Sequence, residues 1–238
     1  MSSQDTGYWA AHVNGAEEDL LTWERELQRP FGVWLEPWGQ KEQSQRLLRS
    51  SSFAAIDTAR EVHREALKIV EVLNGVFRLR TEAGPIVVSG IWKLSPEGKR
   101  DVTMFADAGS IIVSGSAVGR RAGVDDSNGP SDVQKWAELA AKDERLAAML
   151  QYYSTEPMSY VDLYRAYEVV DRYWQGRLHK QCWSPSANQL ERFKRTANYY
   201  HRHSVDPRLK PPSKPMPLAE AAVLVRTVIC ETLREAAG

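Results

Sequence analysis

The densest group of residues that could do chemistry lies in the segment 190–203, which reads LERFKRTANYYHRH. Histidine exchanges protons near neutral pH, and arginine binds the negative charge of a phosphate. Arg195 and His201 are separated by five residues, with Asn198 between them. These three residues are the candidate catalytic group, and their types indicate phosphodiester chemistry or contact with RNA.

Helical geometry tests whether this group can converge. An apolar stripe lies along one side of the expected helix and fixes where its core is. The stripe consists of Leu190, Phe193, Ala197 and Tyr200. Arg195 and Arg202 then point away from the core, and His201 lies about 120° round from Arg195. The catalytic group cannot meet within one straight helix, so an active site needs a second protomer or a helix broken near Tyr199.

A polar stripe runs beside the apolar one on the same helical wheel. It is formed by Glu191, Lys194, Asn198 and His201. Such a stripe is a binding surface, a hydrogen-bond network between helices or a solvated flank, and the solvated or structural role is the commoner one. If the helix binds a partner, the contacts are expected from Glu191, Lys194, Arg202 and His203.

Other groupings of reactive side chains predict less. An HxxC pattern at 179–182 and an HxH pattern at 201–203 supply zinc-ligand types but lack the paired CxxC framework of common structural sites. We therefore expect no metal and no other cofactor. The glycine-punctuated segment 109–119 lacks the GK[ST] of a phosphate loop, which favours a hairpin over a site for a nucleotide cofactor.

Eight tryptophans raise the question of a ligand site, above all Trp34 and Trp38 around Pro37. Tryptophan side chains more often fill cores and interfaces. The tryptophans on predicted apolar faces are Trp23, Trp92, Trp136 and Trp174. Trp38 is the one that the predicted packing does not explain.

Composition bounds the class of protein. The chain has 238 residues, 42% of them apolar and 26% charged, which is enough for one large or two small globular domains. Its 31 basic and 31 acidic side chains cancel, so the total charge gives no argument for nucleic acid or an anionic membrane. The distribution is uneven: residues 1–45 carry three basic and eight acidic side chains, net −5, and residues 175–214 carry nine and two, net +7.

The cellular setting follows from cysteines and apolar runs. Two cysteines cannot make a disulfide framework, and the start MSSQDTGYW has neither the basic nor the apolar region of a signal peptide. The most apolar helical run, 218–233, is interrupted by charges and is too short to span a bilayer. We therefore expect a cytoplasmic protein with no membrane partner.

The first half alternates helix and strand patterns, which predicts an α+β domain over residues 1–118 with a small, mostly antiparallel sheet. Strands are expected at 8–13, 32–38, 76–80, 85–94, 101–105 and 110–115. Helices are expected at 17–28 and 53–73, the second ending at a left-handed cap on Asn74 and Gly75.

The segment 119–132 is rich in glycine and has no apolar cluster, which predicts a linker or long loop. Beyond it the strand patterns cease, and residues 133–238 are expected to form an all-helical bundle. Ser131 and Gln134 have the spacing of a capping box and begin the first helix. Helices are expected at 131–140, 144–153, 159–174, 187–201 and 217–234.

The helical half, 133–238, resembles HEPN domains, which are helical bundles found in prokaryotic toxins and antiphage proteins. The resemblance rests on a penultimate helix with Arg195 and His201, followed by a loop and an apolar last helix. The family pattern is an arginine, usually followed by Asn, Asp or His, with a histidine further on; Thr196 departs from it.

Membership of this family would imply metal-independent RNA cleavage, in which the 2′-hydroxyl attacks the adjacent phosphate. The resemblance then makes His201 the general acid or base and places Arg195 at the phosphate. It also implies a homodimer, because HEPN nucleases typically complete their sites with a second protomer.

Three functions from different classes follow. We favour a non-catalytic HEPN-like interaction or sensor module, in a setting such as antiphage defence, with a protein partner or a second copy of the chain. The alternative is a metal-independent ribonuclease or toxin that acts on RNA as a homodimer. An enzyme centred on the N-terminal domain has least support, because that domain contains no nucleophile motif.

Overall fold

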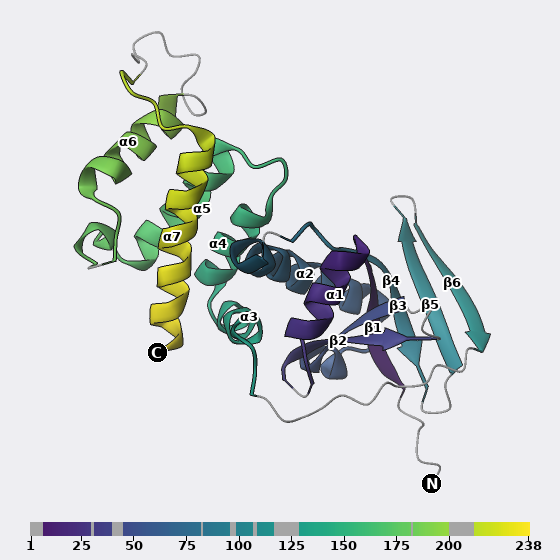
Figure 1. The fold of residues 1–238 in the computed structure, drawn as a ribbon. Helices are drawn as coiled ribbons and strands as arrows, with labels where there is room; N and C mark the ends of the chain where they lie inside the picture. Colours follow the sequence, from purple (N-terminus) through teal and green to yellow (C-terminus); the bar gives the residue numbers. More distant parts are fainter. Residues whose placement is uncertain are drawn as a thin grey trace. The chain divides into compact units, whose positions relative to one another are not determined.

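The computed structural model describes residues 7–29, 31–39, 45–81, 83–95, 99–106, 109–116, 129–181, 183–199 and 212–238. The chain divides into two compact units. Unit 1 comprises residues 1–77 and 83–135, and unit 2 comprises residues 78–82 and 136–238. Unit 1 combines a sheet with helices and unit 2 is helical (Figure 1), which confirms the α+β class that the sequence predicts. None of the described helices is long and apolar enough to cross a membrane.

Unit 1 is built on a six-stranded antiparallel sheet with the strand order β2-β3-β1-β4-β5-β6. Its strands are β1 (Tyr8–Asn14), β2 (Val33–Trp38), β3 (Gln45–Ser50), β4 (Val87–Leu94), β5 (Lys99–Ala106) and β6 (Gly109–Ser116). Its other elements are α1 (Glu17–Glu26), η2 (Ser51–Ala55), α2 (Ala59–Thr81) except its last turn, and the start of α3 (Asp132–Lys142). All the strands except β3 match strands that the sequence predicts.

β3 escapes prediction because its residues do not alternate. The strand reads QRLLRS, so each face of it receives one leucine and one arginine. Arg46 and Arg49 are each neutralised on their own face of the sheet. The guanidinium of Arg46 is buried and pairs with Glu17 at 3.0 Å and with Glu24 at 2.9 Å, both on α1.

Helices α1 and α2 cover the face of the sheet to which Arg46 points, and they lie beside the strands in Figure 1. Trp23 of α1 stacks on Phe77 of α2, with ring centroids 4.6 Å apart. His63 of α2 stacks on Phe105 of β5, with centroids 4.1 Å apart. These aromatic pairs join the helices to each other and to the sheet.

α2 is longer than the sequence predicts. The sequence indicates a cap at Asn74 and a strand over 76–80, and both predictions are wrong because the helix continues to Thr81. Asn74 has no left-handed backbone. Its side-chain amide donates to the carbonyl of Ile86 and accepts from the Ile86 N–H, both at 2.9 Å. Beyond Asn74 the buried Phe77 continues the apolar stripe of the helix.

The opposite face of the sheet is curled onto itself. β2 and β4 are separated by two strands, about 14 Å across a flat sheet. The rings of Trp38 on β2 and Trp92 on β4 nevertheless meet edge to face with centroids 6.5 Å apart. Arg100 of β5 likewise reaches Gln45 of β3, with 3.3 Å between Nη1 and Oε1. Trp38 is only 8% exposed, so packing does explain it and the contrary prediction is wrong.

Charge on this curled face is also neutralised locally. The carboxylate of Glu36 pairs with Arg49 at 3.1 Å and with Arg29 at 3.5 Å. The guanidinium of Arg49 lies 3.8 Å from the ring centroid of Tyr8, and that of Arg29 lies 5.0 Å from the Trp34 ring. These contacts give Trp34 a structural role on the sheet.

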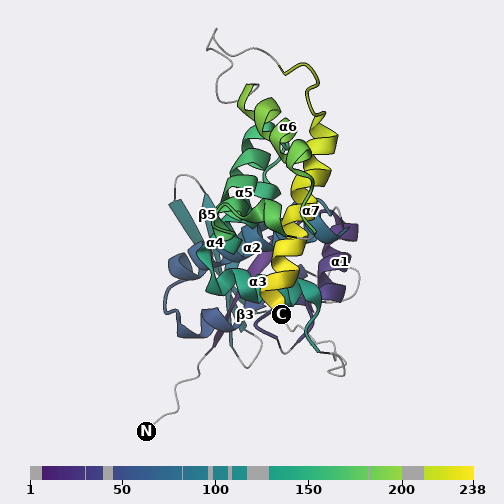
Figure 2. The same cartoon turned by 90° about the vertical axis from the view of Figure 1, so that its left-hand side faces the viewer.

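Unit 2 contains most of α3 together with four further helices and a short 3-10 segment. They are α4 (Glu144–Ser154), α5 (Tyr160–Tyr173), η3 (Leu178–Lys180), α6 (Ala187–Ala197) and α7 (Leu218–Ala237). α5 packs against α4, α6 and α7 (Figure 2). The side chains of Asp143, Ser159 and Ser186 cap α4, α5 and α6 by accepting backbone N–H groups.

The helices that the sequence predicts over 131–234 are confirmed within the described residues. The capping box at the start of α3 is present: Ser131 Oγ accepts the Gln134 N–H at 3.2 Å, and Gln134 Oε1 accepts the Ser131 N–H at 3.1 Å. The predicted helix over 187–201 corresponds to α6, and its last residues, 200 and 201, lie outside the described part of the chain.

Candidate functional site

α6 carries the residues that the sequence singles out. Leu190, Phe193 and Ala197 are buried, as the predicted apolar stripe requires, and Tyr200 lies outside the described residues. Phe193 meets Tyr167 of α5 edge to face, with centroids 5.5 Å apart. The core side of α6 is therefore the one that the helical wheel indicates.

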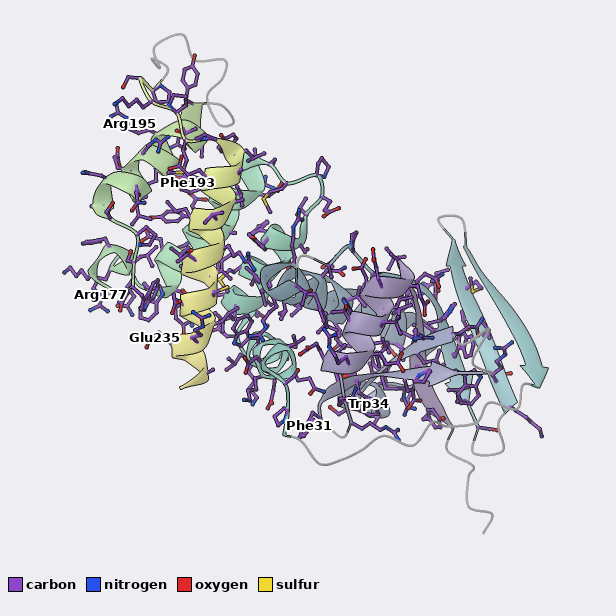
Figure 3. The ribbon with its side chains drawn as sticks, viewed as in Figure 1. Phe31, Trp34, Arg177, Phe193, Arg195 and Glu235 are labelled. Carbon is purple, nitrogen blue, oxygen red and sulfur yellow. The ribbon has the colours of Figure 1, made fainter. Side chains whose placement is uncertain are left out.

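The predicted catalytic group is described only in part. Arg195 is exposed near the end of α6 (Figure 3), and Asn198 is half-buried at its C-cap. His201 lies outside the described residues, as do Arg202 and His203 of the predicted binding residues. The expectation that Arg195 and His201 meet only through a second protomer or a broken helix therefore stays a prediction.

The position that departs from the HEPN pattern serves packing. Thr196 is 0% exposed; its hydroxyl donates to the Arg192 carbonyl at 2.8 Å and accepts the N–H of Met216 at 2.9 Å. Arg192 in turn donates to the carbonyls of Lys214 and Pro215, each at 3.0 Å. This face of α6 holds the chain that returns to α7.

The polar stripe on α6 is partly structural. Lys194 lies 5.2 Å from the ring centroid of Tyr167. Burial acts to lower the pKa of Lys194, but its hydrogen bond to the Tyr167 hydroxyl and the nearby charges of Tyr167 and Asp171 outweigh burial and raise that pKa. Lys194 of α6 thus contacts Tyr167 of α5, and Glu191 on the same stripe is exposed.

A cavity of about 630 Å³ lies at the end of unit 2 opposite Arg195 (Figure 3). We call it the cationic pocket. It is lined by Arg145, Tyr173, Trp174, Gln175, Arg177, Lys180, Gln181 and Glu235. The lining thus contains three cations, two aromatic rings and one carboxylate, and its charged side chains are exposed at the surface.

The turn after α5 places two of these cations. Gln175 and Gly176 both have left-handed backbones, with φ of 54° and 71°. Gly176 N–H bonds the Asp171 carbonyl at 2.8 Å and Gln175 N–H bonds the Arg172 carbonyl at 3.0 Å, which is the Schellman pattern. The chain reverses there and carries Arg177 and η3 back along the pocket.

Arg145 forms a different part of the wall. Its guanidinium is held by Asp143 through two bonds, Nε to Oδ1 at 3.0 Å and Nη2 to Oδ2 at 2.6 Å. The hydrogen bond from Arg145 lowers the pKa of Asp143, so this carboxylate stays charged. The guanidinium also lies 5.0 Å from the ring centroid of Tyr173. Arg145 is largely neutralised, and Arg177 and Lys180 are the cations left to meet a ligand.

The aromatic side of the pocket is fixed in place. The indole N–H of Trp174 donates to Thr232 Oγ1 on α7 at 3.0 Å. Trp174 meets Tyr173 and Trp183 edge to face, with centroids 5.5 Å and 5.8 Å away. These three contacts fix the indole ring of Trp174, so a ligand that contacts it would not have to immobilise the side chain.

Sequence reasoning finds this pocket only in part. Arg177 and Lys180 belong to the basic segment 175–214 that the charge distribution picks out. Arg145 and Glu235 come from the start of α4 and the end of α7, and no spacing rule links them to that segment. The sequence at 173–180, YWQGRLHK, has an aromatic pair, Gln-Gly and two cations. This pattern indicates a helix end rather than a binding site.

Unit 1 contains a serine and a histidine with the residue types of a nucleophile and a base. Ser89 Oγ lies 2.7 Å from His12 Nδ1 and 3.1 Å from the His12 carbonyl oxygen. A register shift after His12 makes Ser89 a bulge residue and turns it toward the ring. Burial, and then the charge of Arg100, lower the pKa of His12. Because the hydroxyl meets both the ring and the backbone of His12, the pair indicates a link between β1 and β4.

No three His, Cys, Asp or Glu side chains of the described residues gather into a metal site. Three residues of the HxxC and HxH patterns lie outside the described residues: Cys182, His201 and His203. No protein-family model matches the chain, and comparison with curated proteins and with solved structures gives no significant match. The HEPN resemblance stays a prediction.

Proposed function

We propose that this protein is a non-catalytic binding module whose helical unit binds RNA at the cationic pocket. The observation that carries the proposal is that two cations without a carboxylate partner among the lining residues, Arg177 and Lys180, line one pocket with Tyr173 and Trp174. Cations of this kind bind backbone phosphates, and aromatic faces stack with any base. A sequence-tolerant contact with single-stranded RNA is what this combination suits.

The proposal of a binding role rather than catalysis rests on α6. Thr196, at the position where HEPN nucleases usually carry Asn, Asp or His, has its hydroxyl engaged with Arg192 and Met216. Lys194 is engaged with Tyr167. The cationic pocket lies at the opposite end of the unit from Arg195, so RNA bound there is not presented to Arg195 by the same contacts.

The ribonuclease stays the second candidate because Arg195 is exposed at the end of α6 and can reach a phosphate. A homodimer in which two α6 helices face each other is the arrangement in which the HEPN pattern would act. The same RNA-binding experiment separates the two functions, since a nuclease consumes its ligand.

Binding is tested by fluorescence anisotropy with a single-stranded RNA labelled at its 5′ end. We expect the double variant Arg177→Ala/Lys180→Ala to bind about tenfold or more weakly than wild type. Loss of two phosphate contacts should also reduce the slope of log K against log salt by about 1.4. The matched control is Lys142→Ala, which removes an exposed cation paired with Glu138, outside the pocket.

Two results would contradict the proposal. One is the absence of RNA binding at low salt, and the other is a double variant that binds as tightly as Lys142→Ala. Cleavage of the RNA that survives chelation and disappears in His201→Ala and Arg195→Ala would establish the ribonuclease instead.

A further inference from the structure

We propose that the cationic pocket binds a ribonucleotide with a free 2′,3′-diol, as found at the 3′ end of an RNA chain. This inference rests on the proposed function and deepens it. It starts from Glu235, the one carboxylate among the lining residues. A site for a phosphate backbone alone gains nothing from a carboxylate, because the two anions repel.

Glu235 is explained if the ligand presents hydroxyl donors beside its phosphate. An ionised carboxylate only accepts hydrogen bonds, and neighbouring ribose hydroxyls can donate two. Carboxylates bind ribose hydroxyls in this way in dinucleotide sites. Glu235 is an exposed residue on the last turns of α7 and lines the same pocket as Arg177. A ligand that fills the pocket can therefore meet a carboxylate and a guanidinium together.

The remaining lining residues fit the other parts of a nucleotide. Tyr173 and Trp174 line the pocket and supply aromatic surface for the base. Arg177 and Lys180 follow the left-handed turn and meet the phosphate. The volume of about 630 Å³ falls within the range of about 300–1,000 Å³ that small-molecule sites occupy.

Within an RNA chain, only the 3′-terminal nucleotide offers a free 2′,3′-diol together with a base and a phosphate. Inside a chain the 3′-oxygen is esterified, so the ribose keeps the 2′-hydroxyl alone and the chain would have to leave the pocket on the side of Glu235. A free ribonucleotide carries the same diol as an RNA 3′ end. The shared chemistry is therefore the diol with its base and phosphate, and the two sources are separated by experiment.

The test compares RNAs of one sequence, labelled at the 5′ end, that differ only at the 3′ end. The ends are a free diol, a 3′-phosphate and a 2′,3′-dideoxy nucleotide, and binding is followed by anisotropy. We expect wild type to bind the dideoxy end about 10- to 100-fold more weakly than the diol, as for loss of hydrogen bonds to a charged group. We expect the 3′-phosphate to bind more weakly than the diol as well.

The decisive variant is Glu235→Gln, and its control is Glu231→Gln, one turn earlier on α7 and paired with Arg234. Both substitutions remove one negative charge, so each changes the net charge of the protein by the same amount. Only Glu235→Gln should lose most of the preference for the diol, whatever its overall affinity. A free ribonucleoside 5′-monophosphate should compete with the RNA, and its 2′,3′-dideoxy analogue should not.

The outcomes separate this inference from the proposed function. Equal binding of the three ends by wild type, with no competition by the monophosphate, overturns the diol site and leaves RNA binding intact. Retention of the diol preference in Glu235→Gln overturns the role of Glu235. Competition by the monophosphate but not by its 2′,3′-dideoxy analogue, without any preference among RNA ends, supports the diol site with a free nucleotide as its ligand; equal competition by the two overturns it. The absence of RNA binding at any salt concentration is a failure of the proposed function itself.

Discussion

Gln175 affects stability through its backbone conformation. Its φ of 54° places an L-residue in the left-handed region. That conformation costs roughly 1–2 kcal/mol for residues other than glycine. Glycine at this position of a Schellman motif avoids the clash but loses more entropy on folding, by about 0.5–1 kcal/mol. We therefore expect Gln175→Gly to raise the free energy of unfolding by about 0.5–1 kcal/mol in urea titrations.

The matched control is Gln181, which also lines the pocket but has an ordinary φ of −72°. Glycine there relieves no clash, so Gln181→Gly should lower the free energy of unfolding. Stabilisation by both substitutions, or destabilisation by both, would contradict the assignment of strain to Gln175.

His12 is expected to make the free energy of unfolding depend on pH. Burial and then the charge of Arg100 lower its pKa in the folded chain, so the unfolded chain binds the proton more readily. The stability from neutral His12 is fully present above the unfolded pKa of about 6.5 and is lost as the pH falls from there through the folded pKa. We expect the free energy of unfolding to decline on going from about pH 7.5 to 5, and the decline to be shallower in His12→Asn.

Asparagine is the suitable replacement because its side-chain oxygen can stand near the position of Nδ1 and keep the contact with Ser89. His63 also has a pKa lowered by burial, so it adds to the decline with the same sign. His63→Asn therefore serves as the parallel variant. If His12→Asn follows the wild-type curve over this range, His12 is not titrating as its surroundings indicate.

At the scale of elements, α2 shows where local patterns stop being informative. Asn74-Gly75 is a common helix end, and VFRLR after it has a strand-like alternation. The helix continues because Asn74 finds a better partner in the backbone of Ile86, 12 residues away. A contact that depends on the return of the chain cannot be read from a window centred on Asn74.

We expect Asn74→Ala to lower the free energy of unfolding by about 1–3 kcal/mol, since it leaves the N–H and carbonyl of Ile86 without their side-chain partners. Denaturant unfolding followed by circular dichroism measures the effect. Asn188→Ala, at an exposed position in the first turn of α6, is the control and should change stability little. If Asn74→Ala leaves the free energy of unfolding unchanged, the hydrogen bonds to Ile86 do not hold α2 to the sheet.

The predicted elements succeed where burial repeats with a regular period. α5 and α7 follow from apolar stripes, and α3 from the capping box at Ser131, because these signals lie within a few residues of each other. β3 fails because Arg46 and Arg49 are neutralised by acids from other elements. Strand patterns assume that charges face solvent, and here they do not.

At the scale of the whole molecule, the fold class could be predicted but the candidate site could not. The α+β class needs only the change from strand patterns to helix patterns along the chain. The cationic pocket needs the ends of three helices, with Arg145, Arg177 and Glu235 brought together over 90 residues. The segment 190–203 has the densest charge, yet Arg192 and Lys194 in it hold parts of the bundle together.

The ion pairs of β3 have a consequence for how this protein meets a polyanion. By its linear composition the N-terminal segment carries net −5, which suggests that it would repel RNA. Yet Glu17, Glu24 and Glu36 each face an arginine of the same unit. Part of the acidity of residues 1–45 is thus neutralised by Arg46 and Arg49, which follow that segment in the sequence, and a nucleic acid near the surface of unit 1 meets a weaker opposing field than the net charge of the segment indicates.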